Sequence, residues 1–179
     1  MLPFIYNFPF FSIILSMFSG TVSSVLNGKW ARRLNFAVLV VVGTLSAILL
    51  GYCVDTGESF TYMMGHFPAP WGNEIRAGML EAFLALFFCI IMLLSIVSGR
   101  VHLLEEIAEE KENQYYILLN LLLSSLLALI YTNDLFTAYV FVEINTIAAC
   151  GLIMIRGTGR TIEAAMRYII MSALGSGLL

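Results

Sequence analysis

Two carboxylates, Asp134 and Glu143, stand nine residues apart at the start of one apolar segment. Asp134 follows an asparagine in a short polar turn, whereas Glu143 lies among aliphatic and aromatic residues. If the segment is a helix that crosses a bilayer, Glu143 lies about 13 Å into a hydrocarbon layer about 30 Å thick. Ionisable groups are costly at that depth and usually belong to functional sites. Glu143 is therefore the first candidate for chemistry in this chain.

On a helix, Glu143 shares one face with Tyr139, Thr146 and Cys150, at positions i−4, i+3 and i+7. We expect this mildly polar face to point into a helix bundle or a water-filled cavity rather than to lipid. A carboxyl in such surroundings takes up and releases a proton as a nearby positive charge comes and goes. The face predicts a proton relay, and the alternative is a structural carboxyl that is hydrogen-bonded to a neighbouring helix.

Three further charged residues are candidates: Arg167 as the charge modulator of the relay, and Asp134 and Glu81 as secondary candidates beside Tyr139 and Thr146. Arg167 lies in a later apolar segment, and helix rise places it about 10 Å nearer the other membrane face than Glu143. Because arginine keeps its charge, it can bias a carboxylate through water but does not pass a proton, and the alternative is a residue that snorkels to the interface. Asp134 is expected to be a helix N-cap. Glu81, near a helix start, is either an interface residue or a second relay.

The composition places the whole chain in a membrane. Of its 179 residues, 60% are hydrophobic and 12% are charged, and the mean hydropathy is +0.90. A soluble domain has about twice that share of charged residues. The net charge of −3 gives no reason to expect nucleic acid as a partner. The three cysteines lie in or beside apolar segments and are interpreted as small buried hydrophobes. The sequence has no nucleotide-loop, paired-cysteine or zinc-helix motif, so we expect no cofactor and no metal.

The uncharged runs predict about six transmembrane helices in an all-α polytopic fold, over residues 3–26, 34–54, 77–99, 115–132, 135–155 and 162–179. The fourth carries Asn120, Ser124 and Ala128 at four-residue intervals, a stripe suited to close helix packing.

Two segments between the helices break the pattern. Residues 55–76 hold two prolines and are expected to form an ordered extramembrane loop or hairpin, with Trp71 at the interface. His66 in this loop is a ligand, a relay or, as most lone loop histidines are, neither. The Glu-rich residues 100–114 are interpreted as a solvated face or as an interfacial helix extension. A docking surface or a carboxylate metal site is the less favoured alternative.

The basic residues predict the orientation. Seven of them follow the first, third and fifth predicted helices, whereas only Arg76 lies on the other side. We therefore expect the N-terminus outside and the Glu-rich segment in the cytoplasm. The seven are Lys29, Arg32, Arg33, Arg100, Lys111, Arg156 and Arg160.

Residues 132–136 (Thr-Asn-Asp-Leu-Phe) and 139–144 (Tyr-Val-Phe-Val-Glu-Ile) resemble the signature of the proton-translocating, antiporter-like membrane subunits. Such subunits occur in complex I and in membrane-bound hydrogenases, and one of them is the D subunit of Mrp-type sodium/proton antiporters. Residues 67–72 are similar to the Mrp and hydrogenase-linked branch, and residues 163–169 with 174–176 resemble the family's sixth helix.

The resemblance implies an all-helical bundle of about fourteen spans, built from two inverted repeats that each contain a broken helix. Glu143 falls on the family glutamate that pairs with a lysine on the broken seventh helix. Arg167 falls where the family usually has lysine, as a modulator of the relay's charge. Gly78 stands at an acidic family position in the third helix, and Glu81 on the same face is the candidate substitute.

We therefore expect the N-terminal portion of a larger antiporter-like bundle. Residues 1–114 would form its first three helices, and residues 115–179 would begin its proton-translocating repeat. The expected function is translocation of protons, with or without Na+, in the plasma membrane beside other membrane subunits. Such a chain would at most be the ion-pumping part of a quinone oxidoreductase or hydrogenase. The alternative is a non-conducting structural subunit of such a complex, and a small-solute transporter is a weaker third.

Overall fold

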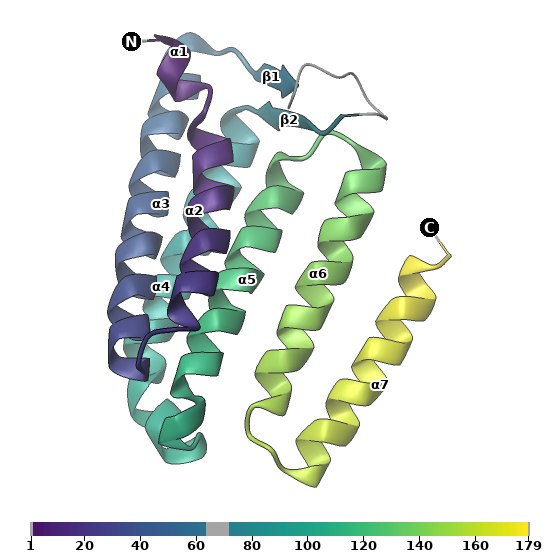
Figure 1. The fold of residues 1–179 in the computed structure, drawn as a ribbon. Helices are drawn as coiled ribbons and strands as arrows, with labels where there is room; N and C mark the ends of the chain where they lie inside the picture. Colours follow the sequence, from purple (N-terminus) through teal and green to yellow (C-terminus); the bar gives the residue numbers. More distant parts are fainter. Residues whose placement is uncertain (1, 64–71, 179) are drawn as a thin grey trace.

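The computed structural model describes residues 2–63 and 72–178 (Figure 1). Its helices are α1 (Leu2–Ile5), α2 (Phe8–Ser23), α3 (Gly28–Thr56), α4 (Met79–Glu106), the 3-10 turn η2 (Glu109–Lys111), α5 (Glu112–Tyr131), α6 (Leu135–Met154) and α7 (Gly159–Ser176). Two strands, β1 (Phe60–Met63) and β2 (Glu74–Ala77), lie between α3 and α4.

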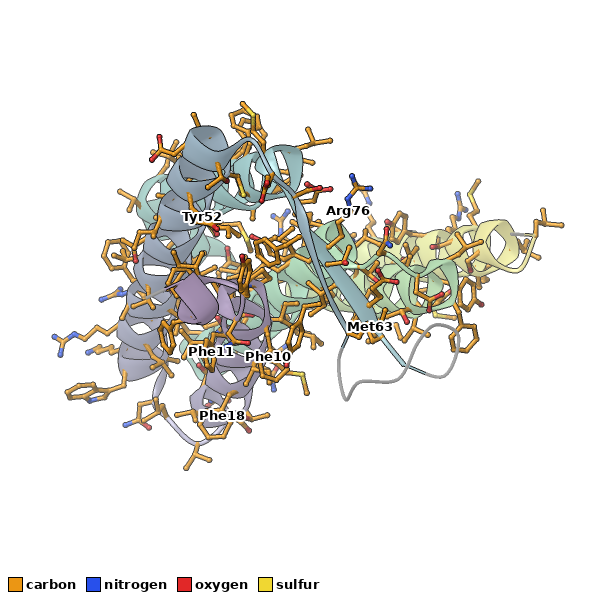
Figure 2. All side chains as sticks on the ribbon, turned by 90° about the horizontal axis from the view of Figure 1, so that it is seen from above. Phe10, Phe11, Phe18, Tyr52, Met63 and Arg76 are labelled. Atoms are coloured by element: carbon orange, nitrogen blue, oxygen red, sulfur yellow. The ribbon has the colours of Figure 1, made fainter. Side chains whose placement is uncertain are left out.

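The long helices run up and down beside one another. Helix α2 packs against α3 and α5, and α3 packs against α4. From α5 the bundle continues through α6 to α7, so these three form a row (Figure 1). Seen from the hairpin end in Figure 2, α6 and α7 extend to one side of the cluster that α2, α3 and α4 form. The face of α7 that points away from α6 is therefore at the edge of the bundle.

Among the described residues, four helices are long and apolar enough to cross a membrane: α3, α4, α5 and α6. Four of the six predicted spans are therefore confirmed as helices of sufficient length and hydropathy. Helix α2 is apolar but has 16 residues, which rise only about 24 Å. Helix α7 has 18 residues and carries three charges, at Arg160, Glu163 and Arg167. Both run alongside the four spans (Figure 1).

Proline chemistry corrects the first predicted helix, residues 3–26. The structure breaks it into α1, which ends at Ile5, and α2, which begins at Phe8. Pro9 stands in the first turn of α2 and has no N–H to donate to the Ile5 carbonyl, so one continuous helix would lack that bond.

Two other helices extend beyond the predicted hydrocarbon segments. Helix α3 begins at Gly28 and so includes three basic residues that were expected to precede it. One of these, Arg33, has its guanidinium carbon 5.0 Å from the centre of the Trp30 ring, an aromatic and basic pair typical of a membrane interface. Helix α4 continues to Glu106, which confirms the predicted helix extension for its backbone.

The core lies where α3, α4 and α5 meet, and its centre contains Leu39, Cys89 and Leu127, all with exposed fractions of 0%. The outward faces of the same helices carry large apolar side chains that suit lipid contact, including Phe36, Ile48, Phe83 and Leu94. Phe18 of α2, 65% exposed, belongs to the same outer surface (Figure 2).

The predicted small and polar stripe of α5 is confirmed, because Asn120, Ser124 and Ala128 are all buried. A matching stripe on α2 faces the bundle, formed by Ser12, Ser16, Ser19, Gly20 and Ser23. A methyl group added at Gly20 would lie 3.4 Å from the Asn120 Cβ, so the two helices approach closely there.

The predicted loop at 55–76 contains an antiparallel hairpin in its described part. Phe60 pairs with Ala77, and Met63 pairs with Glu74. The loop's prolines, His66 and Trp71 fall within 64–71, outside the described residues. The hairpin also binds the α5–α6 turn, because the Asn133 N–H donates to the Glu74 carbonyl at 2.9 Å.

The connections after α2, α4 and α6 lie together at the opposite end of the bundle (Figure 1). Most of the basic residues lie in or near these connections, so we call this the basic end. The Asn113 side chain there donates to the Ser24 carbonyl at 3.3 Å. Glu112, which the sequence assigns to a solvated face, is only 8% exposed. It lies against Gly28 at the start of α3, where the helix dipole favours a carboxylate. The interpretation of 100–114 as a solvated face is therefore wrong for Glu112.

Candidate functional site

Helix α6 carries the candidate site, and its first turn is fixed by Asp134. The Asp134 Oδ2 accepts hydrogen bonds from the Thr137 hydroxyl at 2.7 Å and from the Thr137 N–H at 3.0 Å. This is the predicted N-cap, and it uses one of the backbone donors that a helix start leaves free. Both bonds lower the pKa of the Asp134 carboxyl, and the bond from the Thr137 hydroxyl has the larger effect.

The far end of α6 is fixed by Lys111. Its Nζ lies 3.5 Å from the Ile155 carbonyl, where a cation stabilises the negative end of the helix dipole. Gly157, with φ of 67°, turns the chain beside this amine. These interactions at the two ends of α6 fix the position of Glu143 along the bundle.

The Glu143 side chain points from α6 toward α7. The Ser176 hydroxyl donates a hydrogen bond to Glu143 Oε1. One turn along α6, the Thr146 and Ser172 hydroxyls are 3.1 Å apart. These contacts confirm that the polar face of α6 lies in a helix interface, as the i+3 spacing predicts.

A third contact continues the same interface toward the basic end of the bundle. The Cys150 Sγ lies 3.8 Å from the Ala165 carbonyl. Thr146 is 6% exposed and Cys150 is 2% exposed, which agrees with the expected interior face. Tyr139 does not follow this pattern, because it is 40% exposed.

The other side of α6 faces α5. The Ser125 hydroxyl donates to Asn145 Oδ1 at 3.3 Å. A methyl group added at Gly151 would lie 2.9 Å from the Leu118 side chain, so α5 and α6 are close there. Helix α6 thus packs between α5 and α7, and the partly buried Glu143 side chain faces α7.

Arg167 has its ion-pair partner on its own helix, α7. Its guanidinium pairs with the Glu163 carboxylate at 2.5 Å, one turn back on α7. Both side chains are largely exposed, at 76% for Arg167 and 64% for Glu163. Within the described chain no ion pair joins Arg167 to Glu143. The i,i+4 spacing of Glu163 and Arg167 was a readable signal for this pair.

Glu81 lies in the first turn of α4, with Oε1 4.0 Å from the Arg76 Nε. Its other oxygen would lie 2.8 Å from a Cβ at Gly78, so the carboxylate occupies the space beside that glycine. Arg76 projects from the hairpin end (Figure 2). Helix α5 stands between α4 and α6, so Glu81 and Glu143 lie in different interfaces (Figure 1).

A cavity of about 700 Å³ lies between the hairpin ends of α6 and α7. The residues that line it include Asp134, Phe136, Tyr139, Val142 and Ser176. Among the residues that the structure describes, no group of three or more histidine, cysteine or carboxylate side chains is arranged to hold a metal ion.

The arrangement defines a class: a multi-pass helical membrane protein with a carboxylate in an interface between two helices. Residues 132–179, which contain this interface, match the family model described as NADH:quinone oxidoreductase/Mrp antiporter, TM.

Two curated relatives match much more of the chain. NADH-quinone oxidoreductase subunit N of Desulforudis audaxviator (strain MP104C) is 29% identical over 168 residues, covering 92% of this chain and 33% of that protein. The D subunit of the Na(+)/H(+) antiporter of Bacillus subtilis (strain 168) is 30% identical over 139 residues, covering 76% of this chain and 27% of that protein. The chain therefore spans about a third of the length of these relatives.

The fold agrees with a solved structure, that of the membrane-bound sulfane sulfur reductase, an archaeal respiratory membrane complex. The TM-score is 0.80 with 21% identity, and the match covers 97% of this chain and 34% of that chain. Residues 132–179 thus carry the NADH:quinone oxidoreductase/Mrp antiporter domain, and the relatives of the chain are antiporter-like subunits of this family.

Proposed function

We propose that this chain is a proton-translocating part of an integral membrane subunit, in which Glu143 carries the proton. One observation supports the proposal above the others: Glu143 is a carboxyl deep in an apolar helix, and its side chain meets a hydroxyl of α7 instead of a fixed cation. A relative is named as a sodium/proton antiporter subunit, and another as a quinone oxidoreductase subunit.

The chemistry of the site fits a relay. A carboxylate held by a permanent cation would stay ionised, whereas Glu143 is hydrogen-bonded to a neutral hydroxyl and can exist in both protonation states. A positive charge that approaches would favour the ionised form and release the proton, and its withdrawal would favour uptake. The contact with α7 leaves the Glu143 side chain partly buried in the meantime.

The other candidates take supporting roles in the proposal. Arg167 modulates the charge of the relay over distance, since its own partner is Glu163. Thr146 is a secondary candidate one turn along α6, where its hydroxyl donates to the Val142 carbonyl. Tyr139 and Asp134 lie on the cavity wall, and Glu81 is a second acidic group on α4.

The same proposal covers assembly and location. Residues 1–114 form the first three helices, and residues 115–179 begin the translocating repeat, which agrees with the family match over 132–179. We place the subunit in the plasma membrane with its N-terminus outside, next to other membrane subunits of an antiporter, quinone oxidoreductase or hydrogenase complex. The chain itself has no redox role in this proposal.

The test is proton flux in vesicles that contain the assembled complex. Glu143→Gln keeps the shape and loses the titration, so we expect flux to fall to background while the subunit still assembles. Glu58→Gln, an exposed carboxyl outside the spans, is the matched control and should keep full flux. Flux measured with Na+ and with choline decides whether sodium is moved. Full flux in Glu143→Gln would exclude the relay.

A second function is a non-conducting subunit that scaffolds such a complex. The Ser176 bond favours it to the extent that Glu143 could simply join α6 to α7. This alternative predicts that Glu143→Gln keeps full coupling, because a glutamine oxygen accepts the same bond. The flux measurement therefore separates the two.

A further inference from the structure

The Ser176 hydroxyl has two acceptors within reach. It donates to Glu143 Oε1, and it lies 3.3 Å from the carbonyl oxygen of Ala173 on its own helix. Ser176 is the last residue of α7 and is only 8% exposed. Its hydroxyl is therefore a shielded group with one proton and a choice between two oxygens.

A hydroxyl differs from an amide or a cation because it can donate and accept. When Glu143 is ionised, the Ser176 hydroxyl donates to the carboxylate, the stronger acceptor. When Glu143 is protonated, the serine O–H can turn to the Ala173 carbonyl, and its oxygen then accepts the acid proton of Glu143. Rotation about a single bond exchanges these two arrangements, with no movement of either helix.

We propose that Ser176 is a positioning residue that keeps Glu143 hydrogen-bonded to α7 in both protonation states. The inference rests on the proposed function, because it has a consequence for transport only if Glu143 changes protonation during turnover. It adds to that function the group that holds the relay still while its charge changes. Without Ser176, the neutral or the charged carboxyl would be left without this partner in an apolar interface, which is costly.

The neighbouring hydroxyls, those of Thr146 and Ser172, have other partners. Thr146 donates to the Val142 carbonyl at 2.9 Å, and its oxygen lies 3.1 Å from the Ser172 hydroxyl. Ser172 thus meets a threonine one turn away from Glu143. Ser176 also forms part of the wall of the 700 Å³ cavity, so a water or ion that enters there meets this hydroxyl beside the carboxyl. Ser172 is accordingly the matched control on the same helix.

The experiment compares four variants of the full subunit in its complex: Ser176→Ala, Ser176→Thr, Ser172→Ala and Glu143→Gln. We expect Ser176→Ala to lower proton flux roughly ten-fold, the effect of losing one hydrogen bond to a charged group. Ser176→Thr keeps the hydroxyl and should restore the flux. Ser172→Ala should keep it as well.

Infrared spectra give a readout that packing alone would not change. The carbonyl band of the protonated Glu143 carboxyl is identified by its absence in Glu143→Gln. In Ser176→Ala that band should move to higher frequency, and in Ser172→Ala it should stay. If Ser176→Ala assembles poorly, the flux and the band of Ser176→Thr, compared with Ser176→Cys, a weaker donor, serve the same purpose.

The outcomes separate the two claims. Normal flux and an unmoved band in Ser176→Ala, with no flux in Glu143→Gln, would overturn the role of Ser176 and leave the proposed function intact. Equal losses in Ser176→Ala and Ser172→Ala would also overturn it, because they would indicate general disruption of the α6–α7 interface. Full flux in Glu143→Gln would overturn the proposed function and this inference together.

Discussion

Glu143 and Arg167 illustrate how local partners decide the state of a charged residue in an apolar helix. Glu143 has a neutral partner on another helix, whereas Arg167 is neutralised by a carboxylate on its own helix. The second arrangement lowers the cost of a permanent charge in an apolar helix. The two charged residues therefore differ in the kind of partner they have, a neutral hydroxyl for Glu143 and a carboxylate for Arg167.

Asp134 gives a prediction at the same scale. Hydrogen bonds from Thr137 lower the pKa of this carboxyl in the folded chain. The unfolded value is about 3.9, so the cap's contribution is fully present above about pH 4 and is lost as the pH falls through the lower, folded value. We expect the thermal unfolding midpoint in detergent to fall with pH in this range, and Asp134→Asn to remove that part of the dependence.

Thr137→Val provides the control for the cap. It deletes the hydroxyl that makes the larger contribution and leaves the backbone N–H bond. The fall in the unfolding midpoint should therefore be smaller, and should end at a higher pH, in Thr137→Val than in the unmodified chain. An identical pH profile in all three proteins would show that Asp134 does not contribute through its charge.

Sequence reasoning reached the residues whose partners are close in the chain or fixed by helix periodicity. The Asn-Asp turn before an apolar run predicted the Asp134 cap, and the i+3 spacing predicted the interior position of Thr146. The burial of Glu112 was missed because its neighbour, Gly28, is far away in sequence. Ser176 was not predicted as a site residue, since the alignment of two helices decides what its hydroxyl meets.

At the scale of elements, small and polar residues join α5 to α2 and α3, beside the large apolar side chains of the core. The serines of α2 let it approach α5, and Asn120 of α5 meets Asn35 of α3. The four-residue spacing on α5 predicted a close contact, and the structure has one. Which helix would fill that contact was not predictable, because the same small stripe suits any neighbour.

The paired asparagines give the prediction for this scale. The Asn35 amide donates to Asn120 Oδ1 at 2.8 Å, and both residues are almost completely buried. Their remaining atoms, Asn35 Oδ1 and Asn120 Nδ2, have no partner among the described residues. Asn120→Ala would leave the Asn35 amide unpaired, and we expect it to lower the free energy of unfolding by about 1–3 kcal/mol.

Removing both amides should cost less than the sum of the single changes. The reason is that Asn35→Ala in the Asn120→Ala background removes a group that is already unsatisfied. We expect a coupling free energy of about 1 kcal/mol from unfolding of the four proteins in mixed micelles. Strictly additive losses would mean that the two amides do not support each other in the membrane.

For the whole molecule, the structure separates a hairpin end from a basic end. The hairpin and the Asp134 turn lie at one end, and the connections after α2, α4 and α6 lie at the other (Figure 1). Hydropathy and charge predicted this alternation, because each apolar run had to cross the bundle. The break in α1–α2 needed the local chemistry of Pro9, and the row formed by α5, α6 and α7 needed side-chain packing that no single segment reveals.

The predicted orientation of the two ends can be measured by labelling engineered cysteines. Val25, 89% exposed at the basic end, and Thr61, exposed on the hairpin, are uncharged, so Val25→Cys and Thr61→Cys keep all nine basic residues. The native cysteines are at most 2% exposed and give a low background.

If the basic end is cytoplasmic, a membrane-impermeant maleimide added to intact cells should label Thr61→Cys and should reach Val25→Cys only in inverted vesicles. The reverse pattern would invert the topology while keeping the bundle, whereas labelling of both from one side would contradict the separation of the two ends. Because positive residues fix orientation through their number on each side, a bias of seven to one makes the first result the expected one.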